Sequence, residues 1–263
     1  MSRTKVIAFA NNKGGSGKTT TASNVGCAMA RLGKKVLLID GDMQMNLTLS
    51  LFDEEKALDF AQSGKNVYTA IKEEKSLADF IRKTAHEGLD IIPSSPLMSS
   101  VEFDLFTKWQ REFILKKILA PVYATGYYDF ILIDAPPTLG AWVMNVLTAS
   151  DFVIIPVEAS PWGLFGLANM FDFINQVKGI APKLEVMGIA ITKADERKNY
   201  FKQTVEALKD GDIARLFESY IRVDSAVEWS QDNSVPVVAY KKYSRSALEY
   251  VKLTKEIIKY ADR

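Results

Sequence analysis

A glycine-rich turn lies close to the start of the chain, between an apolar run and a stretch of helical pattern. It reads Asn12-Lys13-Gly14-Gly15-Ser16-Gly17-Lys18-Thr19-Thr20. A turn in this position, at the N-terminus of a helix, directs backbone N–H groups at an anion. The glycines let the backbone fold tightly, Lys18 supplies a point charge, and the Thr19 hydroxyl can hold a magnesium ion. The turn therefore predicts a phosphate-binding loop; the alternative is a glycine turn without a ligand.

Short apolar runs, each bounded by turn residues, alternate with longer helical patterns along the rest of the chain. We expect strands at Val6–Ala10, Val36–Ile39, Leu89–Ile92, Phe130–Ile133, Phe152–Val157 and Val186–Ile191. We expect helices at Lys18–Leu32, Trp109–Leu119, Ala141–Thr148, Gly163–Val177, Arg197–Lys209 and Ser246–Tyr260. This alternation predicts an α/β fold, in which a mostly parallel, twisted sheet is covered by helices on both faces.

The size and composition of the chain favour one domain. With 263 residues and 48% hydrophobic content the chain can build one substantial core, and no shift in composition marks a boundary. We therefore expect a single domain over residues 1–263. The polar stretch Asn46–His86 is interpreted as a surface insertion with short helices.

Composition also excludes several classes of function. The 33 basic and 32 acidic residues leave a net charge of +1, so any contact with nucleic acid would need a local patch. Cys27 is the only cysteine, which excludes an internal disulfide framework and a metal site built from several cysteines. Neither a signal segment nor an apolar stretch of membrane-spanning length is found, so a reducing cytoplasm is the expected location.

Carboxylates stand at the ends of two expected strands. The run Val36–Asp42 carries Asp40 and Asp42 at its end, and the run Phe130–Asp134 ends in an aspartate followed by Ala135, Pro136 and Pro137. Because open α/β sheets bind ligands at the C-terminal ends of their strands, we expect these aspartates beside the phosphate loop. Turn or helix-capping aspartates are the alternative interpretation.

The segment Lys13-Gly14-Gly15-Ser16-Gly17-Lys18-Thr19 resembles the deviant phosphate loop of the ParA, MinD and nitrogenase iron-protein group. The resemblance spans essentially the whole chain and is strongest toward the ParA partition ATPases. It implies a P-loop nucleotide-triphosphatase that uses ATP and Mg²⁺, has weak intrinsic activity, and forms a homodimer with the nucleotides at its interface. Lys13 lies at the entrance of its own loop, so its expected target is the phosphate of the facing subunit; a solvated surface lysine is the alternative.

The resemblance also implies roles for individual residues. Catalytic roles fall on Lys13, Lys18 and Asp42, with Asp42 orienting or activating the attacking water. Magnesium binding falls on Thr19, Asp40 and Asp134, where Asp134 ends the strand that resembles Walker B. Nucleotide contacts fall on Lys13, Gly14, Gly15, Ser16, Gly17, Lys18, Thr19, Thr20, Thr192, Lys193 and Asp195.

Departures from the group separate this chain from some of its branches. The family segment Asp-Pro-Gln-Gly-Asn reads Asp42-Met43-Gln44-Met45-Asn46 here, which leaves the conformation of this switch segment open. The single Cys27 excludes the iron-protein branch, which needs paired cysteines. Ser246–Tyr260 is interpreted as a packing helix rather than a membrane-binding tail of the MinD kind. Because the first strand begins within the first few residues, we expect no N-terminal helix-turn-helix extension.

The choice between ATP and GTP depends on one short segment. Thr192-Lys193-Ala194-Asp195 resembles the base-reading turn of GTPases, whereas Asp195-Glu196-Arg197 resembles a stretch of the ParA proteins, which use ATP. We expect ATP, and GTP remains the alternative.

The expected output of the family is nonspecific, salt-sensitive DNA binding by the ATP-bound homodimer, with hydrolysis stimulated by a ParB-like or other small adaptor protein. Such a protein would be cytoplasmic and nucleoid-associated, and would act in plasmid or chromosome partition. A positioning ATPase for a protein assembly would share every motif, and a nucleotide switch, reading ATP or GTP, could act on protein partners without DNA. The candidate DNA contacts, each of which is otherwise a solvated charge, are Lys198, Lys202, Arg222, Lys241, Lys242 and Arg245.

Overall fold

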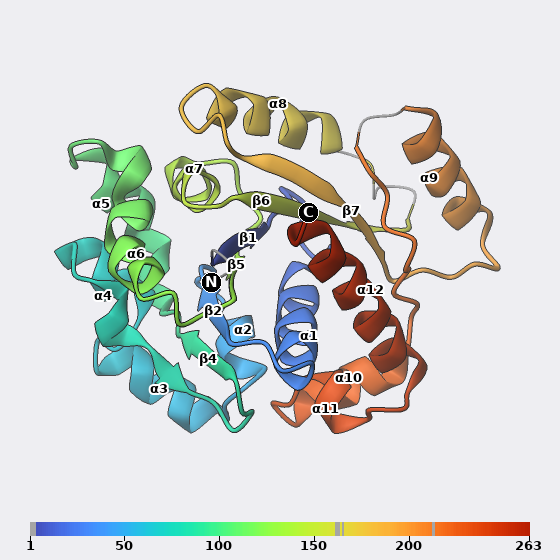
Figure 1. The fold of residues 1–263 in the computed structure, drawn as a ribbon, viewed down its shortest axis with the longest axis horizontal. Coiled ribbons are helices and arrows are strands. Elements are labelled where there is room, and N and C mark those ends of the chain that lie inside the picture. Colours follow the sequence, from blue (N-terminus) through green and yellow to red (C-terminus); the bar gives the residue numbers. More distant parts are fainter. Residues whose placement is uncertain (1–3, 161–163, 165, 212–213) are drawn as a thin grey trace.

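A seven-stranded sheet forms the centre of the molecule (Figure 1). The computed structural model describes residues 4–160, 164, 166–211 and 214–263. The strands lie in the order β3-β4-β2-β5-β1-β6-β7, and all neighbours are parallel except the antiparallel pair β3–β4. Their bounds are β1 Lys5–Phe9, β2 Val36–Asp40, β3 Arg82–Lys83, β4 Leu89–Ile92, β5 Phe130–Asp134, β6 Phe152–Glu158 and β7 Glu185–Thr192.

The central strands are buried along their whole length. Every residue of β2, β4 and β5 is buried, as a parallel sheet covered on both faces requires. Their continuous apolar runs follow from this burial, and the predicted α/β fold class is confirmed. The short β3 was not predicted, since two residues of an edge strand leave no readable alternation.

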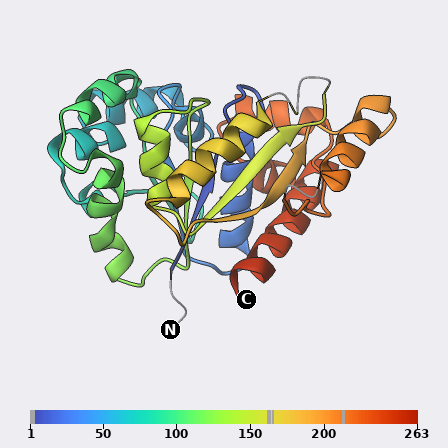
Figure 2. The same cartoon turned by 90° about the horizontal axis from the view of Figure 1, so that it is seen from above.

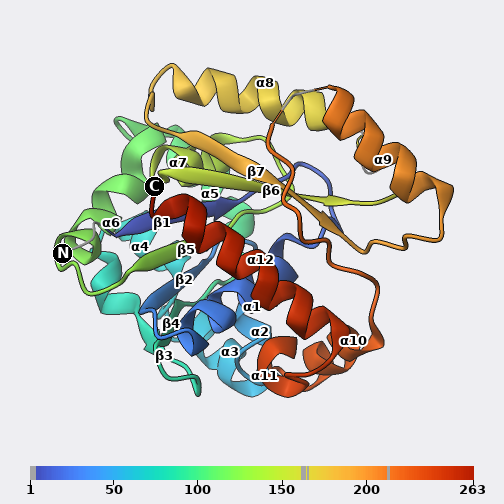
Figure 3. The ribbon, with the colours of Figure 1, turned by 45° about the vertical axis from the view of Figure 1, so that its right-hand side comes forward.

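Helices cover both faces of the sheet, as Figures 2 and 3 show. Side chains of α6, α7 and α8 join one apolar cluster, whereas those of α1 and α12 join a second cluster on the other face. The α-helices are α1 Lys18–Arg31, α2 Asn46–Leu49, α3 Glu54–Gln62, α4 Val67–Glu73, α5 Val101–Phe106, α6 Ile114–Ala124, α7 Ala141–Thr148, α8 Leu167–Lys178, α9 Asn199–Asp210, α10 Ser225–Asp232, α11 Val237–Tyr240 and α12 Arg245–Ala261. Three 3₁₀ turns, η1 Leu77–Phe80, η2 Pro96–Ser100 and η3 Arg111–Phe113, complete the described elements.

Two predicted segments need correction. The helix expected at Trp109–Leu119 begins only at Ile114, because Gln110 adopts φ 51° and cannot be part of an α-helix. The helix then continues through Pro121 to Ala124. The stretch 46–86 has the expected short helices, but it is not confined to the surface: its apolar side chains, such as Val67 and Leu77, are fully buried.

Other boundaries agree closely with the structure. Helix α7 matches its prediction at both ends, and α12 exceeds its prediction by one residue at each end. The start expected for α8, Gly163, lies outside the described residues, and the described helix runs over Leu167–Lys178. Among the helices of the described ranges, none combines the length and the apolar character needed to span a bilayer.

The register of the sheet brings the predicted site together. Strand β5 lies between β2 and β1, and its last residue, Asp134, pairs with Asp40 on one side and with Phe9 on the other. The glycine-rich loop leaves the end of β1 at this same edge. The C-terminal ends of three neighbouring strands therefore deliver the loop and the aspartates to one place.

Candidate nucleotide-binding site

The loop after β1 has the backbone shape of an anion cradle. Gly15 and Gly17 have φ of 74° and 84°, in the left-handed region that favours glycine. A Cβ at Gly17 would lie 3.2 Å from the side chain of Thr192, so this position has little room for a side chain. Helix α1 begins at Lys18 without a side-chain cap, and its first N–H groups are therefore available to a ligand.

Lys18 lies inside the cradle. Its side chain is buried, and Nζ donates to the carbonyl of Lys13 at 3.2 Å, across the loop. Burial lowers the pKa of Lys18, whereas the nearby charges of Asp134 and Asp42 raise it. A cation with this little hydration is well suited to an anionic group entering the loop.

Asp134 is a buried carboxylate at the end of β5. Neither of its oxygens receives a hydrogen bond of ordinary geometry from the described residues, although the Thr19 hydroxyl is close enough to favour the ionised form. Burial and the charge of Asp40 raise the pKa of Asp134 well above its ordinary value. Ser16 Oγ, in the loop itself, is likewise buried without a partner among those residues. Orphaned polar atoms at this edge fit a bound cation and a bound anion.

A magnesium ion fits this edge of the sheet only together with a nucleotide. No group of three or more His, Cys, Asp or Glu side chains converges on one point within the described parts of the chain. Mg²⁺ often keeps several waters and binds through one or two protein groups plus substrate phosphates. Thr19 and Asp134 are the residues at this edge that could supply that minimal protein set.

Asp40 holds helix α2, which follows the switch segment. Its Oδ2 accepts hydrogen bonds from the Thr48 backbone N–H at 2.8 Å and from the Thr48 hydroxyl at 2.6 Å. Burial raises the pKa of Asp40 to about 6, against the effect of these hydrogen bonds. Both donors come from α2, so Asp40 ties this helix to the end of β2. Asp40 pairs with Asp134 in the sheet register, so the two aspartates lie side by side.

Asp42 stands at the mouth of the site. Its Oδ1 accepts from the N–H of Gln44 at 3.0 Å, in a turn that is open to solvent. The switch segment that follows places Met45 at φ 57° and buries its side chain to 5% exposure. A non-glycine residue in this region of backbone space is uncommon and costs about 1–2 kcal/mol. Met43 is 45% exposed, so the two methionines have different environments.

Lys13 is held by its own chain, outside the cradle. Its Nζ lies 3.5 Å from Glu158 Oε2 and 3.4 Å from Ser160 Oγ, at the end of β6. Its backbone N–H donates to Asn11 Oδ1 at 3.1 Å. The ammonium group is therefore turned to the end of a neighbouring strand, while Lys18 occupies the loop.

Residues after β7 border the loop on its other side. The hydroxyl of Thr192 donates to the carbonyl of Ser16 at 2.8 Å, and Lys193 Nζ lies 3.8 Å from the position of a Cβ on Gly15. Asp195 forms an ion pair with Arg197: its two oxygens accept from Arg197 Nε and Nη2 at 2.8 and 2.9 Å. This ion pair lowers the pKa of Asp195 to about 2. A guanine-reading aspartate needs both oxygens for the base, so the Arg197 pair favours adenine.

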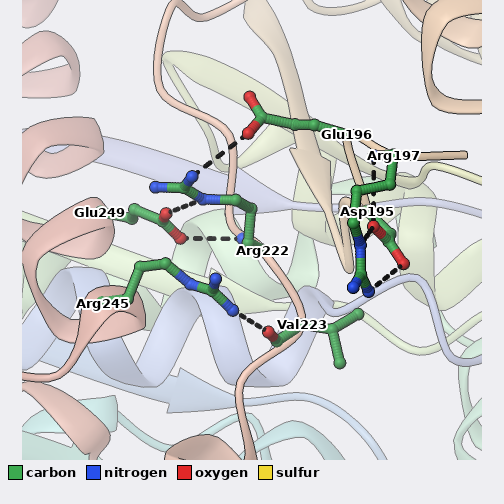
Figure 4. A network of polar contacts seen from close by, with 7 residues as sticks. All are labelled: Asp195, Glu196, Arg197, Arg222, Val223, Arg245 and Glu249. Carbon is green, nitrogen blue, oxygen red and sulfur yellow. Dashed lines mark hydrogen bonds and ion pairs between the residues drawn. The ribbon is translucent and has the colours of Figure 1, made fainter.

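Two of the candidate DNA contacts lie close together in the network of Figure 4. The Arg222 backbone N–H and guanidinium both donate to Glu249, whose side chain is 8% exposed. A second carboxylate, Glu196, lies 3.2 Å from the same guanidinium. Arg245 donates to the carbonyl of Val223. Arg222 is thus compensated by two carboxylates, while Arg245 has a backbone partner.

The other four candidates belong to two separate groups. Lys198 and Lys202 lie at the start of α9 and are exposed. Lys241 and Lys242 follow α11, where Lys241 Nζ lies 3.7 Å from the ring centroid of Trp229 and Lys242 Nζ lies 5.0 Å from that of Tyr243. In Figures 1 and 3, α9 and α11 lie apart. The structure therefore does not place the six candidates in one patch.

Several residues of the site were not predicted from the sequence. Glu158 and Ser160 follow the strand at Phe152–Val157, so the rule of C-terminal strand ends could have found them. Thr48 and Trp142 contact the ends of the strands from helices, and no local pattern marks them. Their positions depend on the packing of elements far apart in the sequence.

Comparisons with known proteins agree with this geometry. The sequence model of a family described as an AAA domain matches residues 4–186. The chain is 35% identical over 254 residues to sporulation initiation inhibitor protein Soj of Bacillus subtilis, covering 96% of this chain and 98% of Soj. It is 33% identical over 255 residues to chromosome partitioning protein ParA of Caulobacter vibrioides, covering 97% of this chain and 94% of that protein.

Solved structures share the fold over almost the full length. A putative plasmid partition protein from Borrelia burgdorferi, bound to AMPPNP, has a TM-score of 0.80 and 28% identity, covering 98% of this chain and 99% of its own. Cobyrinic acid a,c-diamide synthase from Mycobacterium smegmatis, with a bound ATP analogue and magnesium, has a TM-score of 0.82 and 27% identity, covering 97% and 95%.

Proposed function

This chain belongs to the ParA/Soj family of P-loop ATPases, and from that premise we propose that it is an ATP-dependent DNA partition ATPase. ATP and Mg²⁺ close two subunits into a sandwich dimer, the dimer binds DNA without sequence preference, and a partner bound to the cargo stimulates hydrolysis and release. The cargo is a plasmid or a chromosome, and the protein acts in the cytoplasm on the nucleoid.

The position of Lys13 carries the proposal. An ordinary phosphate loop needs one lysine, and Lys18 already occupies the cradle. A second lysine stands at the entrance with its ammonium group on Glu158 and Ser160, at the rim of the site. From this rim Lys13 can reach a nucleotide held by a facing subunit once it leaves Glu158. A lysine in that position neutralises the charge that develops on the transferred phosphoryl group.

The other residues of the site have separate tasks in this proposal. The backbone N–H groups of the loop and Lys18 bind the phosphates, and Thr192 fixes the loop through the carbonyl of Ser16. Thr19 and Asp134 would hold Mg²⁺, which would supply positive charge to offset the charge of the phosphates. Asp42, at the mouth, orients or activates the attacking water. Slow intrinsic turnover follows if Lys13 and Asp42 reach their final positions only in the dimer.

ATP is the proposed nucleotide. The ion pair between Asp195 and Arg197 occupies the two oxygens that would otherwise read guanine. The solved partition protein from Borrelia burgdorferi binds an ATP analogue, and the synthase from Mycobacterium smegmatis binds an ATP analogue with magnesium. The ion pair and the two solved structures support ATP as the nucleotide of this chain.

The test is DNA co-sedimentation of the purified protein with ATP, ADP, GTP or no nucleotide, at low and at moderate salt. Retention with ATP alone, falling as salt rises, is the expected result, because lysine and arginine displace counterions from phosphate. Lys18→Ala, which removes the charge inside the cradle, is the matched control and should abolish retention. Retention of DNA without any nucleotide would refute this scheme. An ATP-induced dimer that never retains DNA would assign the protein to the protein-partner switches.

A further inference from the structure

The backbone on both sides of Asp42 is held by hydrogen bonds. In the peptide between Gly41 and Asp42, the N–H donates to Asp40 Oδ1 at 3.2 Å, and the carbonyl accepts from Trp142 Nε1 at 2.8 Å. In the next peptide, the carbonyl of Asp42 accepts from Ser94 Oγ at 2.7 Å and from the N–H of Met45 at 3.0 Å. Because peptide groups are planar, fixing both of them fixes φ and ψ of Asp42. The direction of its Cα–Cβ bond follows, and the Gln44 N–H, which donates to Asp42 Oδ1 at 3.0 Å, holds the carboxylate itself.

Trp142 is the most distant contributor to this arrangement, 101 residues from Gly41 in the sequence. Its side chain is 1% exposed, and it lies in the first turn of α7. A Cβ at Gly41 would lie 3.2 Å from Trp142 Nε1 and 2.7 Å from the carbonyl oxygen of Asp134. The indole therefore packs directly against the strand end, where only glycine leaves enough room.

The start of α7 is itself fixed. The carboxylate of Glu102, on α5, accepts from the N–H groups of Ala141 and Trp142 at 2.8 and 3.1 Å. An anionic group at a helix N-terminus satisfies the unpaired N–H groups and interacts favourably with the helix dipole. Trp142 is thus presented to Gly41 from an anchored helix end.

We propose that Trp142 is a positioning residue for hydrolysis, which acts through Asp42. Its indole N–H sets the plane of the Gly41–Asp42 peptide and thereby aims the Asp42 carboxylate at the attacking water. The inference rests on the proposed function, in which Asp42 handles that water. Buried tryptophans usually need a partner for their N–H, and here the partner is the carbonyl next to a residue of the reaction.

The variant Trp142→Phe removes the N–H and keeps an aromatic ring. We expect kcat for ATP to fall about fivefold or more, the factor that corresponds to one net hydrogen bond, with little change in KM or in nucleotide affinity. Ser94→Ala, which removes one of the two hydrogen bonds to the carbonyl of the second peptide, should lower kcat in the same direction. Trp109→Phe is the control, because Trp109 is 88% exposed and should leave the rate unchanged.

A structural role alone would not make the effect of Trp142 depend on Asp42. In an Asp42→Ala background, Trp142→Phe should cause no further loss of the residual rate, since both changes act on one step. If Trp142→Phe does not fold, site-specific replacement of Trp142 by benzothienylalanine keeps the bicyclic shape and removes only the N–H. An unchanged kcat in the folded variant, or an equal additional loss in the Asp42→Ala background, would overturn the inference.

The outcomes also separate this inference from the proposed function. If the wild-type protein hydrolyses no ATP, or if Asp42→Ala keeps the wild-type rate, the proposed function fails before Trp142 is tested. If Asp42→Ala is inactive and Trp142→Phe is fully active, the proposed function stands and only the role of Trp142 is lost.

Discussion

Removal of the Arg222 side chain should weaken DNA binding much less than removal of an unpaired surface cation that contacts a phosphate. The guanidinium is held by Glu249, which is nearly buried, and by Glu196, which is 3.2 Å away (Figure 4). The Arg222 backbone N–H donates to the same Glu249 carboxylate at 2.8 Å. These contacts raise the pKa of Arg222. One positive and two negative charges leave this locus with a local charge of about −1.

The expected magnitude follows from counterion release. Each phosphate that a protein neutralises contributes about 0.9 to the slope of log K against log salt concentration. Arg222 is already neutralised within its own chain, so Arg222→Ala should change that slope by far less than about 0.9. Lys202 is exposed on α9 and has no ion pair with the described residues, so Lys202→Ala is the matched control. If Lys202 contacts a phosphate, its removal should reduce the slope by about 0.9.

The assay is titration of nonspecific duplex DNA with the ATP-bound protein at four or more salt concentrations. Fluorescence anisotropy gives log K at each salt, and the wild type sets the reference slope. A loss of about 0.9 for Arg222→Ala would refute the reasoning, because it would mean that the guanidinium leaves Glu249 and Glu196 to contact DNA. In that case Glu249→Gln should strengthen DNA binding.

Further predictions concern the phosphate site. Lys13→Ala should keep nucleotide binding by the monomer and lose hydrolysis, measured by isothermal titration and phosphate release; wild-type turnover would exclude the in-trans role. Asp42→Ala should give an ATP-bound dimer that dissociates slowly, as gel filtration would show. Asp134→Asn should lose magnesium-dependent nucleotide binding yet raise the stability of the nucleotide-free protein by about 1–3 kcal/mol near pH 8. Because folding raises the pKa of Asp134, the wild type loses stability as pH rises above about 4, so the gain should shrink in acid. Met45→Gly relieves about 1–2 kcal/mol of backbone strain but forfeits a buried side chain worth about 2–5 kcal/mol, so chemical denaturation should show a net loss.

The phosphate loop and the three strands around it could be predicted because their signals are local. Each of these signals lies within about ten residues of sequence. They are the glycines of the turn, the lysine and hydroxyl that follow them, and the apolar runs that end in aspartate. The register of β2, β5 and β1 then places Asp40 and Asp134 side by side without any further information. Rules for strand ends in α/β sheets are enough to assemble this part of the site.

The contacts that orient these groups could not be predicted, because they join elements distant in sequence. The Trp142 indole reaches Gly41 across 101 residues, and Thr192 reaches Ser16 across 176. The candidate DNA contacts also could not be assessed without the tertiary structure. In the sequence Arg222 resembles a free surface charge. In the structure it contacts Glu249 of α12, which lies 27 residues later in the chain. Charge in a sequence is local, whereas compensation of charge depends on tertiary structure.

Two buried charges and a strained backbone position lie at or near the phosphate site. Asp134 and Lys18 are buried ionisable groups. Burial raises the pKa of Asp134 and lowers that of Lys18, which favours the neutral form of each. Met45, in the switch segment, has a strained backbone. Such features lower the stability of the fold. A ligand that brings a cation to Asp134 and anionic oxygens to Lys18 compensates both charges at once. Nucleotide and magnesium binding should therefore stabilise the fold, by an amount that grows with the ligand concentration relative to its Kd.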